Sequence, residues 1–255
     1  MTVVFKNLKK WTEFTKGSKY FGKQVGFVPT MGALHEGHAS LFKRSKAENE
    51  ITVVSIFVNP TQFNNQNDFK NYPVTMESDL HILETCGVDY LLLPNYDEMY
   101  RDKYRYRVEE NEVSSILCGA HRPGHFAGVL TVVMKLLNLA RANKAYFGEK
   151  DYQQYILIKG MAESFFLPTE IIPCATIRAK DGLALSSRNL RLSASERELA
   201  NSFASELKKK DNIEKVKENL INKGFQVDYI EDHFGRRFGA VHLGDVRLID
   251  NVSLS

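Results

Sequence analysis

Four short apolar runs, each followed by a segment with helical character, are the feature that most constrains the fold of this 255-residue chain. The runs are QVGFVPT (24–30), ITVVSIFV (51–58), VDYLLLP (88–94) and KAYFG (144–148), and the helical segments lie near 36–48, 75–86, 125–141 and 151–165. Continuous apolar strands that alternate with helices are what a parallel sheet covered on both faces requires. The sequence therefore predicts an α/β fold, a Rossmann-like doubly wound parallel sheet.

Beyond residue 175 the pattern changes. A Lys/Glu-rich stretch runs from 193 to 223, and the pattern S-A-S-E, from Ser193 to Glu196, opens it as a helix capping box. We expect a large domain of residues 1–174 and a small C-terminal α+β domain of residues 175–255.

The charge balance and the cysteine content indicate which binding partners and which cellular compartment to expect for this chain. The chain has 34 basic and 31 acidic residues, which is too even a balance for a nucleic-acid-binding face but suits a mildly basic site for a small anion. Its three cysteines form no C-x-x-C pair, which favours reduced thiols in a cytoplasmic protein. The most apolar run, FAGVLTVVMKLLNLA, is short and interrupted by Lys135 and Asn138, so we expect no membrane partner.

The polar loops that follow three of the strands are PTMGALHEGH, NPTQFNNQ and FGEKDYQQ. Ligands of open α/β sheets bind beyond the carboxyl ends of the strands. These loops are therefore expected to converge on one site.

The first loop carries G-A-L-H-E-G-H-A at 32–39. It is not a P-loop, because His38 and Ala39 replace the lysine and the hydroxyl residue, and it is neither G-x-G-x-x-G nor H-E-x-x-H. His35 and His38 are spaced to share one face at a helix start, where a phosphate is well placed and Gly32 and Gly37 leave room for it. Two other interpretations remain open. The histidines can be surface residues of a helix, or they can be a pair of metal ligands, although no further ligands are apparent in the sequence.

H-E-G-H after a strand resembles the H-x-G-H signature of the nucleotidyltransferase superfamily. Members of that superfamily activate a carboxylate or a phosphate by transferring a nucleotide from ATP. The resemblance implies that the first loop holds the triphosphate.

The other two loops offer polar ligands. Asn59 and Gln62 present neutral amides that can bind hydroxyl and carboxylate oxygens, although a polar loop would also explain them. Lys150 can bind phosphate and Asp151 a hydroxyl such as that of ribose, and only one of the two glutamines at 153 and 154 is expected to face the pocket.

Two later segments add candidates. RAKDGLALSSRN, 178–189, resembles a variant of the second, mobile signature of the superfamily, with Ser186, Ser187 and Arg188 contacting phosphates. RPGHFAGV, 122–129, is explained by a helix start, although Arg122 and His125 can also reach the site.

Together with LGDVRLIDN near the C-terminus, these motifs resemble in order, along nearly the whole chain, the pantoate-beta-alanine ligase (pantothenate synthetase) family. The resemblance implies that pantoate and ATP form pantoyl adenylate and pyrophosphate, after which the amine of β-alanine displaces AMP and gives pantothenate. It also implies that the large domain binds nucleotide and pantoate, and that the C-terminal domain is a closing lid. The region between about Gly224 and Gly244 departs from the family in being shorter than usual.

The resemblance also assigns residues. His38 is implied as proton donor, and the catalytic group comprises His35, His38, Lys150 and Arg188. The ATP-binding group comprises Met31, Gly32, His35, Gly37, His38, Gly148, Lys150, Asp151, Ile177, Leu185, Ser186, Ser187 and Arg188. Pantoate and β-alanine are assigned to Met31, Asn59, Gln62 and Gln154. Mg²⁺ is expected with ATP, held mostly by phosphates and water, with Glu77 and Asp79 as conceivable outer ligands, and a homodimer is implied.

Two rival functions are compatible with the same motifs. One is another adenylyl-transferring enzyme, which the acid that supports exchange of pyrophosphate into ATP would reveal. The other is a non-catalytic nucleotide- or metal-binding module that uses His35 and His38 as ligands, which metal analysis and turnover assays would reveal.

Overall fold

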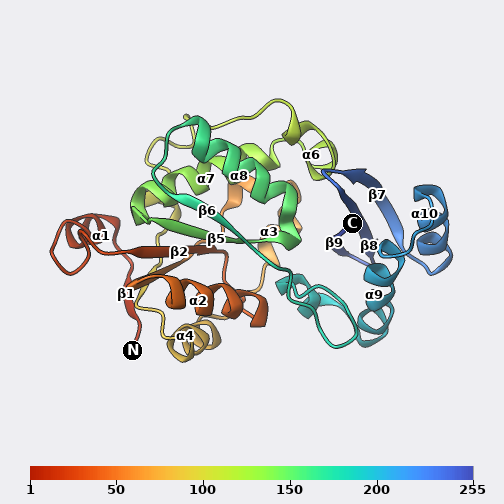
Figure 1. The fold of residues 1–255 in the computed structure, drawn as a ribbon, viewed down its shortest axis with the longest axis horizontal. Helices are drawn as coiled ribbons and strands as arrows, with labels where there is room; N and C mark the ends of the chain where they lie inside the picture. The colour runs from red at the N-terminus through yellow and green to blue at the C-terminus, as the bar shows by residue number, and fades with distance from the viewer. Residues whose placement is uncertain (255) are drawn as a thin grey trace.

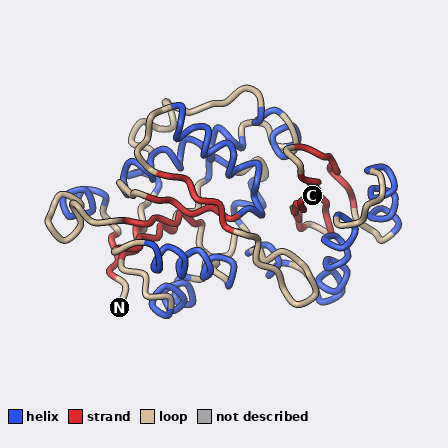
Figure 2. The backbone as a smooth tube through the Cα atoms, viewed as in Figure 1, coloured by secondary structure: helices blue, strands red, loops and turns tan. Residues whose placement is uncertain are grey.

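Six parallel strands form the main sheet of the computed structural model, which describes residues 1–254. The strands are β1 (Val3–Phe5), β2 (Val25–Thr30), β3 (Ile51–Ile56), β4 (Tyr90–Leu92), β5 (Lys144–Gly148) and β6 (Glu170–Cys174), in the spatial order β1-β4-β3-β2-β5-β6. The central strands β2 and β3 are almost wholly buried, because helices cover both faces, and their sequences are correspondingly apolar without alternation. The predicted parallel α/β sheet is confirmed (Figures 1 and 2).

Strands β2 and β5 mark the switch point of this sheet. The chain runs from β2 to β3 and β4 on one side, then crosses to β5 and β6 on the other side. β2 and β5 are hydrogen-bonded neighbours, with Gly26 opposite Lys144 and Phe27 opposite Ala145. The loops that follow these two strands therefore begin side by side, at the place where open parallel sheets bind their ligands.

The sequence analysis missed both edge strands. β1 has only three residues and is mostly exposed, so it lacks the apolar run that marks a buried strand. β6 contains Pro173, a residue that sheets tolerate at their edges, and β6 pairs with β5 alone. The weak sequence signals of these strands follow from their position at the edges.

Helices cover both faces of the sheet (Figure 1). α2 (Glu36–Glu48) and α4 (Met76–Thr85) lie on one face, and α7 (His125–Ala140) and α8 (Tyr152–Ser164) lie on the other. All four agree closely with the predicted segments. The shorter helices are α1 (Leu8–Phe14), α3 (Gln66–Lys70), α5 (Tyr96–Met99) and α6 (Cys118–His121), and the 3-10 turns are η1 (Pro60–Gln62), η2 (Val113–Ser115), η3 (Glu149–Asp151) and η4 (Ser187–Arg191).

A second, antiparallel sheet forms the C-terminal part of the chain. It consists of β7 (Gln226–His233), β8 (Arg236–Leu243) and β9 (Val246–Ser253), and it packs against α9 (Ala194–Leu207) and α10 (Ile213–Asn222). Ser193 and Glu196 form the predicted capping box. Phe203, Val216 and Ile230 belong to a hydrophobic cluster of this part alone. The small α+β unit is therefore as expected, while the boundary between residues 174 and 175 stays a prediction.

The C-terminal sheet is attached beside the end of β5. Nδ2 of Asn251 donates hydrogen bonds to the carbonyl oxygens of Glu149 at 2.8 Å and Lys150 at 2.9 Å. The carboxylate of Asp250 forms an ion pair with Arg178, with contacts of 2.6 and 2.9 Å. The late sequence motif thus fixes the turn that carries Lys150.

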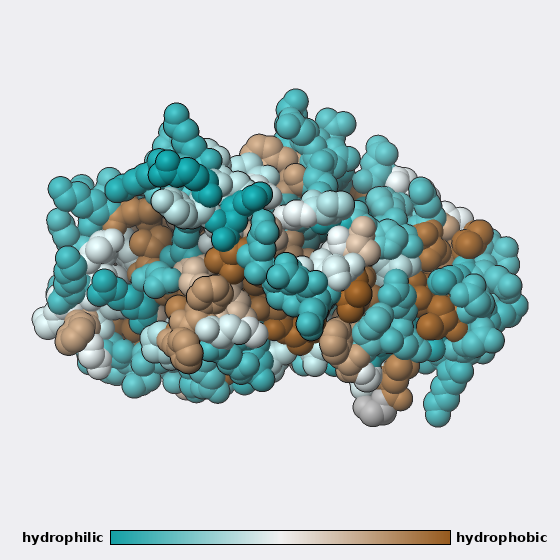
Figure 3. Space-filling view, turned by 90° about the horizontal axis from the view of Figure 1, so that it is seen from above, coloured by the Kyte–Doolittle hydropathy of each residue, from teal (hydrophilic) through white to brown (hydrophobic). Residues whose placement is uncertain are grey.

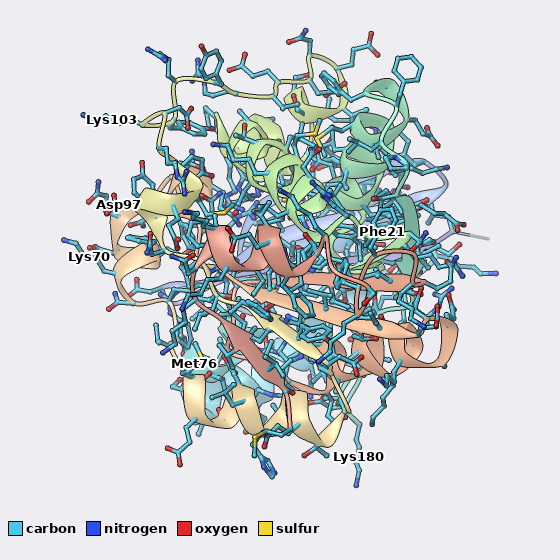
Figure 4. The ribbon with its side chains drawn as sticks, turned by 90° about the vertical axis from the view of Figure 1, so that its left-hand side faces the viewer. Phe21, Lys70, Met76, Asp97, Lys103 and Lys180 are labelled. Carbon is cyan, nitrogen blue, oxygen red and sulfur yellow. The ribbon has the colours of Figure 1, made fainter. Side chains whose placement is uncertain are left out.

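The surface seen in Figure 3 is predominantly hydrophilic, with hydrophobic side chains in small groups. Lys70, Lys103 and Lys180 extend outward at its edges (Figure 4). Among residues 1–254, no helix combines the length and the apolar character needed to cross a bilayer.

Candidate active site

A buried carboxylate fixes the loop after β2. Asp79 accepts hydrogen bonds from the backbone N–H groups of Ala33 at 3.0 Å and Leu34 at 2.8 Å, and from the Thr75 hydroxyl at 3.0 Å. Gly32 has a φ of +81°, and a Cβ there would lie 3.0 Å from Oδ2 of Asp79. This turn and this carboxylate by themselves require a glycine, so the expected contact of Gly32 with nucleotide stays a prediction.

Replacing Asp79 with alanine is expected to lower the free energy of unfolding by about 3 kcal/mol, because two buried N–H groups lose their acceptor. Urea denaturation of wild type and variant measures the difference. Glu77→Ala, at an exposed position of the same helix, is the control and is expected to change stability by less than about 0.5 kcal/mol. Equal effects of the two substitutions would refute the role given to Asp79.

The two histidines cap the start of α2 reciprocally. His35 is the residue that precedes the helix, and its Nδ1 accepts a hydrogen bond from the N–H of Gly37 at 3.1 Å. Nδ1 of His38 accepts a hydrogen bond from the N–H of His35 at 3.3 Å. The ring centroids are 4.2 Å apart. A Cβ at Gly37 would lie 2.8 Å from the His35 ring, so glycine here makes room for the imidazole as well as bordering the site.

These contacts define the protonation of both rings. A ring nitrogen that accepts a hydrogen bond carries no proton, so each neutral imidazole has its proton on Nε2. Burial and the nearby Lys150 ammonium lower the pKa of His35 to about 4. Burial, His35 and Lys150 lower the pKa of His38 to about 3. Both rings are therefore neutral at pH 7 and can donate a hydrogen bond through Nε2.

Burial and the Arg122 guanidinium lower the pKa of a third histidine, His125, from 6.5 to about 3. Between pH 7 and pH 5 the unfolded chain binds a proton at this residue that the folded chain does not bind. The free energy of unfolding is therefore expected to fall by about 2 kcal/mol over that interval through His125 alone. The test is to measure the free energy of unfolding at pH 7 and at pH 5. The variant is His125→Gln, and the control is His81→Gln, at an exposed position. A drop in stability of the same size in His125→Gln would contradict it.

A cavity of about 230 Å³ lies at the switch point and collects nearly all the predicted site residues. Its lining includes Met31, His35, Gly37, His38, Gln62, Gly148, Lys150, Asp151, Gln154, Ile177, Leu185, Ser186, Ser187 and Arg188. Gly32 and Asn59 are the two predicted residues absent from this lining. The structure thus brings the loops after β2, β3 and β5 together with the segment after β6.

Asn59 supports Gln62 and does not face the cavity. The residue is 1% exposed, and its Nδ2 donates hydrogen bonds to Oε1 of Gln62 at 3.1 Å and to the carbonyl oxygen of Gly128 at 3.2 Å. Its Oδ1 accepts from the Tyr100 hydroxyl at 2.8 Å. Nε2 of Gln62 lies 3.2 Å from the Met31 sulfur. The assignment of Asn59 as a direct ligand fails because its polar atoms are already occupied within the protein.

Of the two adjacent glutamines of α8, only one lines the cavity, as expected. Gln153 is 5% exposed, and its side-chain amide forms hydrogen bonds with the backbone of Val113, Ile116 and Cys118. Gln154 lines the cavity, and its side chain has no hydrogen-bond partner among residues 1–254. Gln153 therefore anchors the preceding loop, and Gln154 is available to a ligand.

The cationic side chains of the site differ in their pairing. Nζ of Lys150 lies 3.5 Å from the Asp151 carboxylate, and its side chain is 14% exposed. Arg188 contacts Oδ2 of Asp68 at 2.9 Å, and Arg191 contacts Oδ1 at 2.6 Å. These arginines hold the pKa of Asp68 below its usual range against the opposing effect of burial.

The sequence analysis overlooked Tyr72 and the apolar residues of α7, which border the cavity, and Asp68, which pairs with Arg188. The Tyr72 hydroxyl lies 3.1 Å from the Ser187 hydroxyl. Val129, Val132 and other α7 side chains form an apolar wall. The segment NDFKNYP, 67–73, carries no recognisable signature, and the sequence of α7 is that of an ordinary core helix.

The described residues, 1–254, contain no cluster of three or more His, Cys, Asp or Glu side chains suited to a metal ion. His35 and His38 direct their Nδ1 atoms at backbone N–H groups. The carboxylate of Asp79 also accepts hydrogen bonds from backbone N–H groups. Neither Glu77 nor Asp79 lines the cavity. The metal-pair interpretation of the histidines therefore has no support, and neither has that of Glu77 and Asp79 as outer metal ligands.

A parallel sheet with a histidine-capped helix and a lysine-bearing turn at its switch point defines a nucleotidyltransferase-like α/β protein. Residues 3–253 match the family described as pantoate-beta-alanine ligase. The chain is 51% identical over 251 residues to a pantothenate synthetase of Legionella pneumophila (strain Lens), covering 98% of this chain and 99% of the relative. It is 52% identical over 247 residues to that of Bdellovibrio bacteriovorus, covering 97% and 98% of the two chains.

Solved structures of the same family superpose closely on this chain. The pantoate-beta-alanine ligase of Francisella tularensis, complexed with beta-gamma ATP and beta-alanine, superposes with a TM-score of 0.95 at 44% identity, covering 100% of this chain and 98% of the other. The pantothenate synthetase of Thermus thermophilus gives a TM-score of 0.90 at 35% identity, covering 99% of each chain.

The chain belongs to the pantoate-beta-alanine ligase family, and it is a ligase that joins pantoate to β-alanine. The resemblance inferred from its motifs is confirmed. The shorter C-terminal region does not set it apart from these relatives, because the chain covers 98–99% of the length of each relative and structure described above.

Proposed function

We propose that the cavity at the switch point binds ATP and pantoate and forms pantoyl adenylate, which β-alanine then converts to pantothenate with release of AMP. The observation that carries this assignment is the convergence of the histidine-capped helix, the Lys150 turn and the Ser186 to Arg188 turn on one cavity. The nucleotide-complexed Francisella tularensis relative supports it.

The first step joins two anions, so the site has to reduce their repulsion. The carboxylate of pantoate attacks the α-phosphorus of ATP, a P–O bond forms, and the bond to pyrophosphate breaks. Lys150, Arg188 and the start of α2 supply positive charge and dipole for the phosphates. The Nε2–H groups of His35 and His38 donate hydrogen bonds to phosphoryl oxygens as negative charge moves onto them.

We assign Mg²⁺ to the phosphates rather than to a dedicated protein site. Mg²⁺ commonly binds through one or two carboxylates, substrate phosphates and water. The Asp151 carboxylate and the hydroxyls of Ser186 and Ser187 line the cavity, and this small donor set fits such an ion. The ion would cancel part of the triphosphate charge.

Pantoate is assigned to the wall formed by Gln62, Gln154 and Met31. Neutral amides orient the carboxylate of pantoate and leave it nucleophilic. An arginine at the same place would reduce its nucleophilicity by pairing with its charge. The apolar side chains of Val129 and Val132 on α7, together with Met31, suit its gem-dimethyl group. The C-terminal sheet, attached to the Lys150 turn, is assigned as the lid that keeps water from the adenylate.

The deciding experiment measures pyrophosphate release from Mg-ATP with pantoate, with and without β-alanine. Pantoate-dependent exchange of labelled pyrophosphate into ATP is expected without β-alanine, and pantothenate only with it. Exchange supported by a different acid would instead favour another adenylyl-transferring enzyme.

Replacing Gln62 with alanine is expected to raise the KM for pantoate by about 10- to 100-fold, the effect of losing a hydrogen bond to a charged group. The KM for ATP is expected to change by less than about 3-fold, because the amide faces the pantoate wall. Initial rates of exchange measure both constants. An equal loss of nucleotide affinity would contradict the assignment.

We also propose a homodimer located in the cytoplasm. The family resemblance supports the dimer, and three cysteines without a disulfide are consistent with a reducing compartment. Sedimentation equilibrium of the purified chain tests the dimer, and a monomer at micromolar concentration would contradict it.

A further inference from the structure

A second cavity, of about 660 Å³, lies between the main sheet and the C-terminal sheet. It shares with the smaller cavity the side chains of Met31, Gln62, Lys150, Asp151, Gln154, Ser186 and Arg188. The shared wall includes the two glutamines assigned to pantoate. An acyl group held at that wall is therefore accessible from the larger cavity.

Arginine side chains from both parts of the chain line the larger cavity, and most of them have carboxylate partners. Arg188 and Arg191 bind Asp68, and Arg247 binds Asp228 at 2.7 Å. Arg122 differs: among residues 1–254 it forms no ion pair with a carboxylate.

Two contacts fix Arg122 at the shared wall. Nη1 donates a hydrogen bond to Nε2 of His125 at 3.0 Å, and Nη2 donates to the carbonyl oxygen of Gln62 at 3.2 Å. Nδ1 of His125 donates to the same carbonyl at 2.8 Å. A guanidinium has five N–H groups, so Arg122 keeps donors for a ligand.

The surroundings of Arg122 are short of negative charge. Burial and the neighbouring Arg188 and Arg247 lower the pKa of Arg122 to about 10, against the opposing effects of Cys118 and Asp68. Asp68, the carboxylate among these groups, is already shared by two other arginines. An anion placed beside Arg122 would relieve this imbalance.

We propose that Arg122 binds the carboxylate of β-alanine and so positions its amine for attack on the pantoyl adenylate. This inference rests on the proposed function. β-Alanine carries a carboxylate two methylene groups from its amine, so a carboxylate held by Arg122 leaves the amine directed toward the shared wall. Pyrophosphate is a poorer match, because Arg122 borders the larger cavity only, whereas the histidine-capped helix borders the smaller one.

The bond changes are those of an acyl transfer. The amine nitrogen bonds to the acyl carbon, the bond from that carbon to the AMP phosphate oxygen breaks, and protons leave the nitrogen for the AMP phosphate or water. Only a neutral amine attacks, and the cations around Arg122 favour loss of the ammonium proton. Arg122 is therefore a residue that both selects and orients the second substrate.

Arg122→Met and Arg122→Lys test the proposal, with Arg101→Met at an exposed position as the control. In Arg122→Met the KM for β-alanine is expected to rise about 30- to 100-fold, the effect of losing a charged hydrogen-bonding partner, with a smaller rise in Arg122→Lys. Pantoate-dependent pyrophosphate exchange is expected to stay within about 3-fold of wild type. Trapping of the adenylate by hydroxylamine, an acceptor without a carboxylate, is expected to be equally little changed.

Two results would overturn the proposal. One is an equal loss with β-alanine and hydroxylamine, which would mean that Arg122 only maintains the structure. The other is an unchanged KM for β-alanine with weaker product inhibition by pyrophosphate, which would assign Arg122 to that anion. Absence of pantoate-dependent exchange in the wild type is a different outcome, because it would refute the proposed function itself.

Discussion

Replacing His38 with alanine is expected to slow pantoate-dependent pyrophosphate exchange by about 100-fold or more, the scale for a lost catalytic hydrogen-bond donor. His38 is held by its own helix start, since its Nδ1 accepts from the N–H of His35 and leaves the Nε2 proton for the phosphates. Alanine removes that donor at the point where negative charge develops.

His81→Ala is the matched control, because His81 is exposed on α4 and lines neither cavity. Exchange by this variant is expected to equal that of the wild type. Loss of the cap also weakens the start of α2, so the stability of His38→Ala should be measured alongside its activity. Normal exchange in His38→Ala would exclude His38 from the adenylation step.

Replacing Lys150 with methionine is expected to reduce exchange by about 100- to 1,000-fold, with little loss of stability. The side chain is 14% exposed, and its one counter-ion among residues 1–254 is Asp151 at 3.5 Å. Methionine preserves the apolar stem but removes the charge that opposes repulsion between carboxylate and triphosphate.

The matched control is Lys159→Met, on the exposed face of α8, where the lysine pairs with Glu163 at 3.7 Å. Single-turnover formation of pyrophosphate separates chemistry from binding in the Lys150 variant. A defect confined to ATP affinity, with an unchanged rate at saturation, would mean that Lys150 binds the ground state and the transition state equally.

The central part of the fold was predictable because burial on both faces leaves a plain sequence signal. β2 and β3 are continuous apolar runs, and the four covering helices follow them in order. The edge strands were missed for the opposite reason, since β1 is short and exposed and β6 contains Pro173. Edge strands need less apolar sequence, so pattern analysis detects them poorly.

The sequence analysis predicted which loops form the site, but it did not predict the direction in which individual side chains point. Asn59 and Gly32 lie in the correct loops, but one supports Gln62 and the other accommodates Asp79. Such differences depend on hydrogen bonds between residues far apart in the chain. The lack of a carboxylate partner for Arg122 among residues 1–254 could not have been predicted either, because it depends on where Asp68 and Asp228 find their partners.

The shared carboxylate of Asp68 has a consequence for turnover. Arg188 and Arg191 approach opposite oxygens of one carboxylate, with contacts of 2.9 and 2.6 Å. If a phosphate group draws Arg188 away, Arg191 still neutralises the half-buried anion, so the exchange leaves no bare charge behind. The proposed contact of Arg188 with phosphate would therefore leave Asp68 with the counter-ion Arg191.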